Sequence, residues 1–397
     1  MTSYDEYRST RVFTALDGLR ALSVIAVIWQ HTSGNPGPAF FSKGGFGVEF
    51  FFAISGFLIT TLLLRERDRT GLISLRGFYA RRTLRIMPLY YLVLAVYVVL
   101  TLAMRADTAQ GRSFIENLPA FATYTSNWFV DLAGGEGVTF YFAWSLATEE
   151  QFYLFWPPVL VAALAAAGLL RRGSLALPLC ALGALVAVNQ LALAAAGRIG
   201  GGPRGVDPGG ADLTGALHSP AALVVTVLAS LSLPILLGSA AAVLLHRRRV
   251  FEAVAPVLTS AWCAPALVIL TLASLVWDTP KQLTQVCMVL LVASVCATEH
   301  TVLHPLLRWR PLAHIGVVSY GVYLMHMLCA NALRLVLPEH YSVWLFVLTT
   351  VLVVAVASAS YRWIETPLIA LGRKLSQRVQ VRRGVPEPGV PRILPSA

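Results

Sequence analysis

Residues 16–31 read LDGLRALSVIAVIWQH, an apolar run that nevertheless contains Asp17, Arg20 and His31. A membrane-spanning helix needs about 20 mostly apolar residues. A charged side chain in such a helix is costly to insert, so it indicates a functional or partnered position. This stretch therefore predicts a first transmembrane helix that faces a polar interior.

Apolar runs of similar length fill the rest of the chain. Of its 397 residues, 56% are hydrophobic and only 13% are charged, against about 25% charged in an ordinary soluble domain. We expect an all-α polytopic membrane protein with about ten transmembrane helices in one bundle. The expected segments are 12–33, 47–64, 86–104, 148–170, 174–196, 221–245, 254–277, 282–299, 313–336 and 342–364. The aromatic stretch 114–145 is expected to be an interfacial or re-entrant piece.

The loops between these segments differ in their content of Lys and Arg. One set of alternate loops, with both termini, holds 22 of the 31 basic residues, and the other set holds 6. Because cytoplasmic loops are enriched in Lys and Arg, we expect both termini in the cytoplasm and the chain in the plasma (inner) membrane. The same rule explains the net charge of +11 without nucleic acid as a partner. Residues 1–372 would form the transmembrane domain, and 373–397 a basic, Pro-rich, disordered cytoplasmic tail.

Polar side chains in or beside the expected helices form two groups by depth. The outer group contains His31, and the inner group contains Arg20. These two residues lie 11 positions apart, which places them on one stripe of a helix, separated by about 16 Å. Ser319, Tyr323 and His326 share one face of a later helix. The outer group also contains Glu49, Asn127, Ser145, Glu149 and Glu150, and the inner group Arg81, Arg82, Arg85, Arg362 and Glu365.

Each of these residues also has an ordinary structural interpretation. Glu49 could be a carboxylate near a helix end, and Glu149 with Glu150 could be a first helical turn stabilised by the helix dipole. Arg82 and Arg85 could be basic loop residues of the usual cytoplasmic kind. His326 could be a structural hydrogen-bonding histidine. The joint arrangement favours a polar passage through the bundle.

Six sequence motifs resemble the membrane-bound acyltransferase-3 family and follow that family's order from residue 14 to 368. One departure is Glu49, where the family more often has Asp. The motifs are LDGLRA (16–21) with His31, GGFGVEFFFAISGFLI (44–59), RRTLRIMP (81–88), WSLATEEQFY (144–153), SYGVYLMH (319–326) and IETP (364–367).

The resemblance implies a bundle of ten helices that transfers an acyl group from acyl-CoA to a hydroxyl group. It implies that Arg20 and His31 are required for activity, and that Arg82 and Arg85 contact coenzyme A. We expect a stand-alone member without a fused extracytoplasmic domain. Its acceptor would be a carbohydrate or a macrolide-type or polyketide-type secondary metabolite. Acyl-CoA would be a co-substrate, and no bound cofactor or metal is expected.

The residues suggest how the transfer would proceed. His31 would take the hydroxyl proton, because the pKa of histidine lies near neutrality, and Glu149 or Glu150 would orient its imidazole. Arg82 and Arg85 would bind the CoA phosphates with paired donors, while the pantetheine arm passes Arg20.

Further polar residues would complete the binding site. Ser145, Asn127 or Tyr323 would donate a hydrogen bond to the oxyanion. Glu49, His326 and Glu365 would also line the site. The alternative is a transporter or flippase of a glycolipid or small molecule, since polar residues inside a bundle fit that class too.

Overall fold

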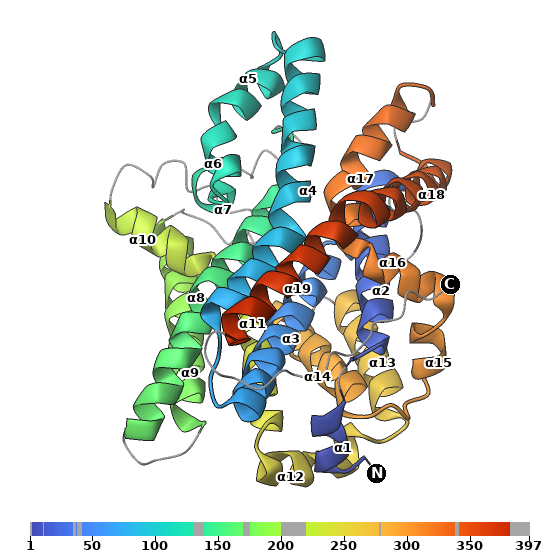
Figure 1. The fold of residues 1–397 in the computed structure, drawn as a ribbon. Coiled ribbons are helices and arrows are strands. Elements are labelled where there is room, and N and C mark those ends of the chain that lie inside the picture. Colours follow the sequence, from blue (N-terminus) through green and yellow to red (C-terminus); the bar gives the residue numbers. More distant parts are fainter. Residues whose placement is uncertain are drawn as a thin grey trace.

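The computed structural model describes residues 2–10, 12–34, 37, 42–130, 138–169, 175–199, 220–277, 279–337 and 341–381. In these residues the chain forms helices and turns, without strands. Figure 1 shows the long helices lying against one another, with α5 and α6 near one end of the molecule and α1 and α12 near the other. The all-α class predicted from composition is confirmed.

The helices have the following bounds: α1 Tyr4–Ser9, α2 Ala15–Thr32, α3 Phe46–Thr70, α4 Leu75–Met104, α5 Ala109–Glu116, α6 Leu118–Ala122, α7 Ser126–Phe129, α8 Ala143–Leu169, α9 Ala176–Ile199, α10 Pro220–Ala229, α11 Leu233–Leu245, α12 Arg248–Leu258, α13 Cys263–Val276, α14 Lys281–Ala297, α15 His304–Leu307, α16 Arg310–Val317, α17 Ser319–Arg334, α18 Val343–Ser360, the π-helical turn η3 Tyr361–Glu365, and α19 Thr366–Val381.

Several helices are long and apolar enough to cross a membrane. Within the described residues, five continuous helical stretches meet this requirement, namely α3, α4, α8, most of α9, and α18 with the residues that follow it to Arg378. Three bent pairs raise the number to eight if each pair is one span: α10–α11, α12–α13 and α16–α17, with bends of 53°, 77° and 80°. The protein is therefore a polytopic membrane protein.

The expected number of ten spans stays a prediction. Helix α14 is apolar but has only 17 residues, and α2, which carries Asp17 and Arg20, is not among the five or the eight. Each of the ten expected segments nevertheless coincides with a helix or a bent pair. In the stretch 114–145, the described residues 114–130 and 138–145 form the end of α5, the short helices α6 and α7, and the start of α8. This agrees with the assignment of the stretch as something other than a span.

Two helices begin earlier than the hydropathy pattern predicts. Helix α4 begins at Leu75, where the hydroxyl of Ser74 caps it by accepting from the Gly77 N–H at 3.2 Å. Its 30 residues extend for about 45 Å, beyond the roughly 30 Å hydrocarbon core of a bilayer. Helix α8 likewise begins at Ala143. Arg82 and Arg85 therefore lie within α4 rather than on the cytoplasmic loop where the sequence analysis placed them.

Glycines allow helix backbones to approach closely in the centre of the bundle. A Cβ atom on Gly56 of α3 would lie 2.0 Å from the Ile235 carbonyl oxygen of α11. One on Gly238 of α11 would lie 2.4 Å from the Ala53 carbonyl oxygen of α3. Small residues at helix contacts are typical of membrane bundles. This contact fixes α3, which supplies one wall of the pocket described below.

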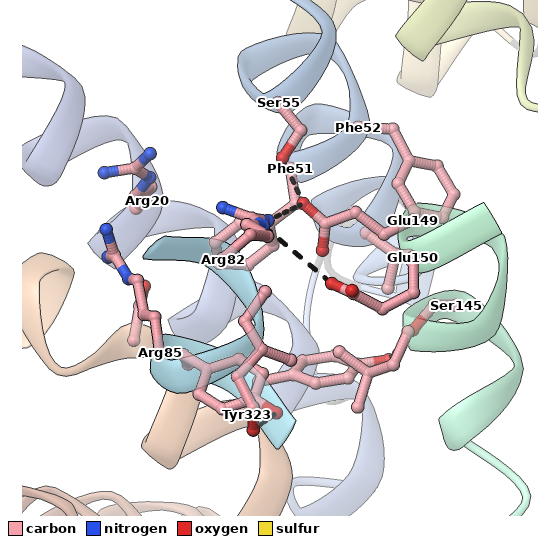
Figure 2. A pocket seen from close by; sticks show the side chains of 15 residues that line it. Arg20, Phe51, Phe52, Ser55, Arg82, Arg85, Ser145, Glu149, Glu150 and Tyr323 are labelled. Atoms are coloured by element: carbon pink, nitrogen blue, oxygen red, sulfur yellow. Dashed lines mark hydrogen bonds and ion pairs between the residues drawn. The ribbon is translucent and has the colours of Figure 1, made fainter. Parts of the chain in front are cut away.

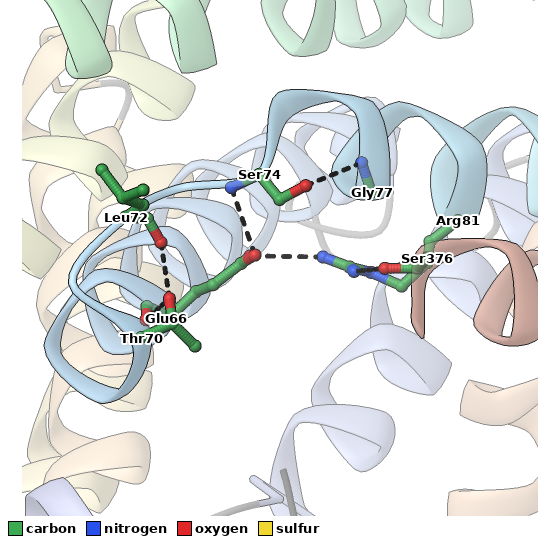
Figure 3. Close-up of polar contacts among 7 residues, drawn as sticks. All are labelled: Glu66, Thr70, Leu72, Ser74, Gly77, Arg81 and Ser376. Carbon is green, nitrogen blue, oxygen red and sulfur yellow. Dashed lines mark hydrogen bonds and ion pairs between the residues drawn. The ribbon is translucent and has the colours of Figure 1, made fainter. Parts of the chain in front are cut away.

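Helix α19 continues through residues 373–381, past the boundary that composition predicted at residue 372. It packs along α4, and Ser376 accepts a hydrogen bond from the guanidinium of Arg81. Arg81 also lies 3.4 Å from Glu66, which accepts from the Ser74 N–H at 3.2 Å (Figure 3). These contacts hold the first nine residues of the expected tail in a helix. Residues 382–397 lie outside the described residues.

Candidate active site

One pocket lies between five helices of the bundle and gathers Arg20, Arg82, Arg85, Glu149, Glu150 and Tyr323 from the ionisable residues selected in the sequence (Figure 2). Helix α2 contributes Arg20 alone. The full lining comprises Arg20, Val48, Phe51, Phe52, Ser55, Arg82, Arg85, Ile86, Ser145, Leu146, Glu149, Glu150, Ser319, Tyr320 and Tyr323.

Helical periodicity explains which side chains reach the pocket. On α3 they are Val48, Phe51, Phe52 and Ser55, a spacing that forms one stripe of a helix. Glu49 lies about 100° away from Val48 around the same helix. One stripe of α3 therefore supplies both apolar rings and a hydroxyl group to the pocket.

Arg82 is held between acidic and aromatic groups of α8. Its guanidinium lies 3.5 Å from Glu149, 3.8 Å from Glu150 and 3.6 Å from the centroid of the Tyr153 ring. An arginine above an aromatic face is attracted by the ring quadrupole. Arg82 is therefore paired within the protein and is positioned to balance the charge of two carboxylates.

Arg85 and Arg20 lie together on another side of the pocket, as Figure 2 shows. Arg20 pairs with Asp17 at 3.0 Å. Arg85 is exposed and makes no ion pair or hydrogen bond with any residue that the structure describes. Two guanidinium groups, one of them unpaired in the described chain, make this side of the pocket suitable for an anion.

Glu149 and Glu150 do not lie where the depth analysis placed them. They were expected beside His31, with Arg82 on the opposite side of the membrane, but they pair with Arg82. Glu149 also accepts hydrogen bonds from Ser55 and Tyr153. The earlier start of α8 places both carboxylates about 10 Å along that helix, and the earlier start of α4 moves Arg82 inward to meet them. None of these contacts joins either carboxylate to His31, and its orientation by Glu149 or Glu150 stays a prediction.

Ser145 and Tyr323 form a pair of hydroxyl groups in the pocket. Their oxygens lie 2.6 Å apart, and each hydroxyl also lies 3.1 Å from the carbonyl oxygen of Phe142. Both side chains line the pocket. Each hydroxyl has a single hydrogen, so either one would give up one of these contacts to donate to a developing oxyanion.

His31 lies beside the pocket rather than among its lining residues. Its Nδ1 atom is 3.2 Å from Nε2 of His326, and its backbone oxygen accepts from Arg334 at 2.8 Å. His326 in turn contacts the backbone oxygen of Tyr323 through Nδ1. A chain of hydrogen-bonding groups thus runs from the pocket residue Tyr323 through His326 to His31.

Three other predicted site residues lie away from the pocket. Glu49 pairs with Lys281 at 2.7 Å and accepts from Gln285 at 2.9 Å, which ties α3 to α14. The amide of Asn127 donates to Gln151 at 3.0 Å and accepts from it at 2.9 Å, which ties α7 to α8. Both side chains thus join neighbouring helices, and neither lines the pocket.

Glu365 is the third residue that lies away from the pocket lining. It is buried in η3, with one carboxylate oxygen that has no hydrogen-bond partner. The described residues contain no group of three or more His, Cys, Asp or Glu side chains that could hold a metal ion.

Two hydroxyl partners of Glu149 were not among the residues selected from the sequence. Ser55 donates to Glu149 from within the apolar run of α3, and Tyr153 donates to Glu149 from one turn further along α8. The contact of Tyr153 could have been predicted, because Tyr153 follows Glu149 by four positions on a helix. The contact of Ser55 could not, because the sequence shows only a lone hydroxyl among apolar neighbours.

The chain is similar to O-acetyltransferases. A protein of Bacillus subtilis (strain 168), named as a candidate peptidoglycan O-acetyltransferase, is 29% identical over 96% of this chain and 58% of its own length. The peptidoglycan O-acetyltransferase OatA of Listeria monocytogenes is 28% identical over 91% of this chain and 56% of its own length. A candidate O-acetyltransferase of Staphylococcus aureus (strain COL) is 39% identical over 40% of this chain and 26% of its own length.

The chain thus spans little more than half the length of the relatives that it matches from end to end. No solved structure matches it. The family model described as an acyltransferase domain matches residues 13–362, which is nearly the whole chain. The matched residues include the pocket, both histidines and the first five of the six motifs, and the chain belongs to the membrane-bound acyltransferase-3 family.

Proposed function

We propose that this protein transfers an acetyl or other short acyl group from acyl-CoA to a hydroxyl group of a carbohydrate at the membrane. The observation that carries the proposal is the pocket itself. It combines a pair of guanidiniums, Arg20 and Arg85, with a pair of hydroxyls, Ser145 and Tyr323, inside a membrane bundle. The first pair suits a phosphate-bearing donor, and the second suits the oxyanion of acyl transfer.

Arg85 would make the main contact with the CoA phosphates. It is exposed and makes no ion pair or hydrogen bond with the described residues, whereas Arg82 already balances Glu149 and Glu150. Arg20 would add a second charge, since its only described partner is Asp17. This division modifies the expectation that Arg82 and Arg85 act as an equivalent pair.

The donor would enter from the cytoplasm, where acyl-CoA is made. The excess of basic residues in one set of loops supports a cytoplasmic location for both termini. Helix α4 begins after one of these basic loops, so Arg82 and Arg85 would lie within about 15 Å of that end. The nucleotide would then remain near the cytoplasmic side while the pantetheine arm extends along the pocket.

His31 would act as the general base. It takes the proton of the acceptor hydroxyl while the hydroxyl oxygen attacks the thioester carbonyl. The C–O bond of the ester forms, the C–S bond breaks, and the CoA thiolate recovers the proton from the imidazolium. Before the C–S bond breaks, Ser145 or Tyr323 would donate a hydrogen bond to the oxyanion. One such donor typically raises kcat by about 10²–10³-fold.

The acceptor would be a carbohydrate hydroxyl on the outer side of the bundle. His31 lies near the C-terminal end of α2, and α2 begins at the end assigned to the cytoplasm. The names of the two relatives matched over more than nine-tenths of this chain refer to peptidoglycan, and this supports a carbohydrate over a macrolide-type acceptor.

The test uses the purified chain in lipid nanodiscs with [¹⁴C]acetyl-CoA and three acceptors: muropeptides, a neutral oligosaccharide and a macrolide. We expect labelled ester with a carbohydrate acceptor and release of free CoA in equal amount. The Arg85→Ala variant should lose most of this activity, and Arg76→Ala, an exposed arginine at the start of α4, should retain it.

Two results would overturn the proposal. Labelled ester on the macrolide alone would exclude the carbohydrate acceptor. No consumption of acetyl-CoA with any acceptor, together with flux of a glycolipid across vesicles, would favour the transporter alternative.

A further inference from the structure

His326 and His31, the two histidines that are hydrogen-bonded in series with Tyr323, differ in solvent accessibility. The side chain of His326 is fully buried, at 0% exposure, and its ring packs against Phe142 with centroids 5.2 Å apart. His31 is only half-buried. Of the two rings, only His31 has accessible surface, so His326 can act on a substrate only through its neighbour.

The contacts of His326 determine which of its nitrogens carries hydrogen. Its Nδ1 faces the backbone oxygen of Tyr323, and a carbonyl oxygen can only accept, so Nδ1 must donate. The ring is fully buried and no carboxylate contacts it among the described residues. A charged ring would be costly there, so His326 is neutral and its Nε2 is an acceptor.

The same reasoning extends to His31. Its Nδ1 lies 3.2 Å from Nε2 of His326, and an acceptor nitrogen requires a donor, so Nδ1 of His31 carries the hydrogen. A neutral imidazole has one N–H, which leaves the lone pair of His31 on Nε2. The backbone carbonyl of Tyr323 thus determines the tautomer of His326, and His326 determines the tautomer of His31.

We propose that His326 is a positioning residue that fixes the tautomer of His31, so that Nε2 of His31 is the atom that takes the acceptor proton. The assignment of that proton transfer rests on the proposed function, but the tautomer does not. On transfer, the proton of the acceptor hydroxyl moves to Nε2 as its oxygen bonds to the thioester carbon. The Nδ1–H of the resulting imidazolium continues to donate to His326, and Nε2 then returns a proton to the departing thiolate.

The tautomer is tested directly by ¹⁵N NMR of the ¹⁵N-histidine-labelled protein in lipid bilayers, with the His31 signals assigned by their loss in His31→Asn. We expect a protonated Nδ1 and an unprotonated Nε2 in His31. In His326→Gln the amide oxygen can replace Nε2 as acceptor, and the tautomer should be kept. In His326→Asn the shorter amide cannot reach, and the His31 signals should shift toward a mixture of tautomers.

Kinetics provide the second measurement. His326→Asn should lower kcat about 10²-fold with little change in KM, in line with the usual contribution of general base catalysis, and His326→Gln should recover most of this loss. The matched control His314→Gln replaces a histidine of α16 that contacts Ser358 and should leave kcat unchanged. Thermal unfolding of each variant identifies misfolded protein.

Two outcomes would overturn the proposal: a His31 with its hydrogen on Nε2, or a tautomer that is unchanged in His326→Asn. Equal losses of kcat in the Asn and Gln variants, with both folded, would reduce His326 to a packing residue. If the protein has no acyltransferase activity the NMR result still stands, so failure of the proposed function is distinguished from failure of this inference.

Discussion

The guanidinium of Arg82 lies 3.5 Å from Glu149 and stacks on the ring of Tyr153, whose hydroxyl donates to the same carboxylate. The three groups come from two helices, α4 and α8, and form a closed set of contacts. Less than one fifth of the Arg82 and Glu149 side chains is exposed. A charge removed from such a set leaves its partner without compensation.

We therefore predict that Arg82→Met destabilises the protein. The free energy of unfolding should fall by roughly 3 kcal/mol, because Glu149 and Glu150 lose their shared counter-charge. Adding Glu149→Gln to Arg82→Met should restore part of the loss. Thermal unfolding in detergent measures both, and a double variant no more stable than the single one would contradict the assigned pairing.

Arg85→Ala should act on substrate affinity instead of stability. Arg85 makes no ion pair with a carboxylate among the described residues, and its charge attracts Glu365 only from a longer distance. Its removal should therefore cost less stability than removal of Arg82. Loss of one charge-assisted hydrogen bond costs about 1.5–3 kcal/mol, which corresponds to a rise in KM for acyl-CoA of about 10-fold or more. Isothermal titration calorimetry with CoA measures the change in affinity, with Arg76→Ala as the control. Equal CoA affinity in the Arg85 variant and the wild type would exclude the phosphate contact.

Glu49→Gln tests the distinction between packing and catalysis. Glu49 is only 6% exposed and pairs with Lys281, so the single change should lower the free energy of unfolding by removing the carboxylate that lies 2.7 Å from the Lys281 ammonium. The double variant Glu49→Gln/Lys281→Met should recover stability. Wild-type kcat in the double variant is expected, and a large fall in kcat despite recovered folding would return Glu49 to the active site.

Gly238→Ala should destabilise the contact between α3 and α11. The added methyl group would lie 2.4 Å from the Ala53 carbonyl oxygen, and overpacking of this kind costs about 1–3 kcal/mol. Gly183→Ala on α9 is the matched control, since nothing lies within 4 Å of its Cβ position, and it should gain up to about 1 kcal/mol of helix propensity. A melting temperature that falls equally in both variants would argue against close α3–α11 packing.

Hydropathy predicted the class of the fold and the position of each apolar segment, because a bilayer imposes the same length and polarity on every span. It could not predict helix ends outside the hydrocarbon region. Helix α4 continues backwards through polar residues as far as Ser74, whose cap determines its start. The bends of α10–α11, α12–α13 and α16–α17 also depend on packing that hydropathy does not measure.

The same limit explains the partial success at the site. Arg20, Ser145 and Tyr323 line the pocket as expected, together with Arg82 and Arg85. Depth estimated from segment ends separated Arg82 from Glu149 and Glu150, because errors of 11 and 5 residues in two helix starts accumulate. Glu49 and Asn127 do not line the pocket, because depth along the membrane does not determine the direction in which a side chain points.

The attachment of α19 to α4 has a practical consequence for anyone who works with this protein. Arg81, held by Ser376 and Glu66, directly precedes Arg82 in the chain, so cutting α19 short would loosen the helix that aims the pocket arginines. A protein truncated before residue 376 should therefore bind its substrate more weakly. An affinity tag is better attached away from α19.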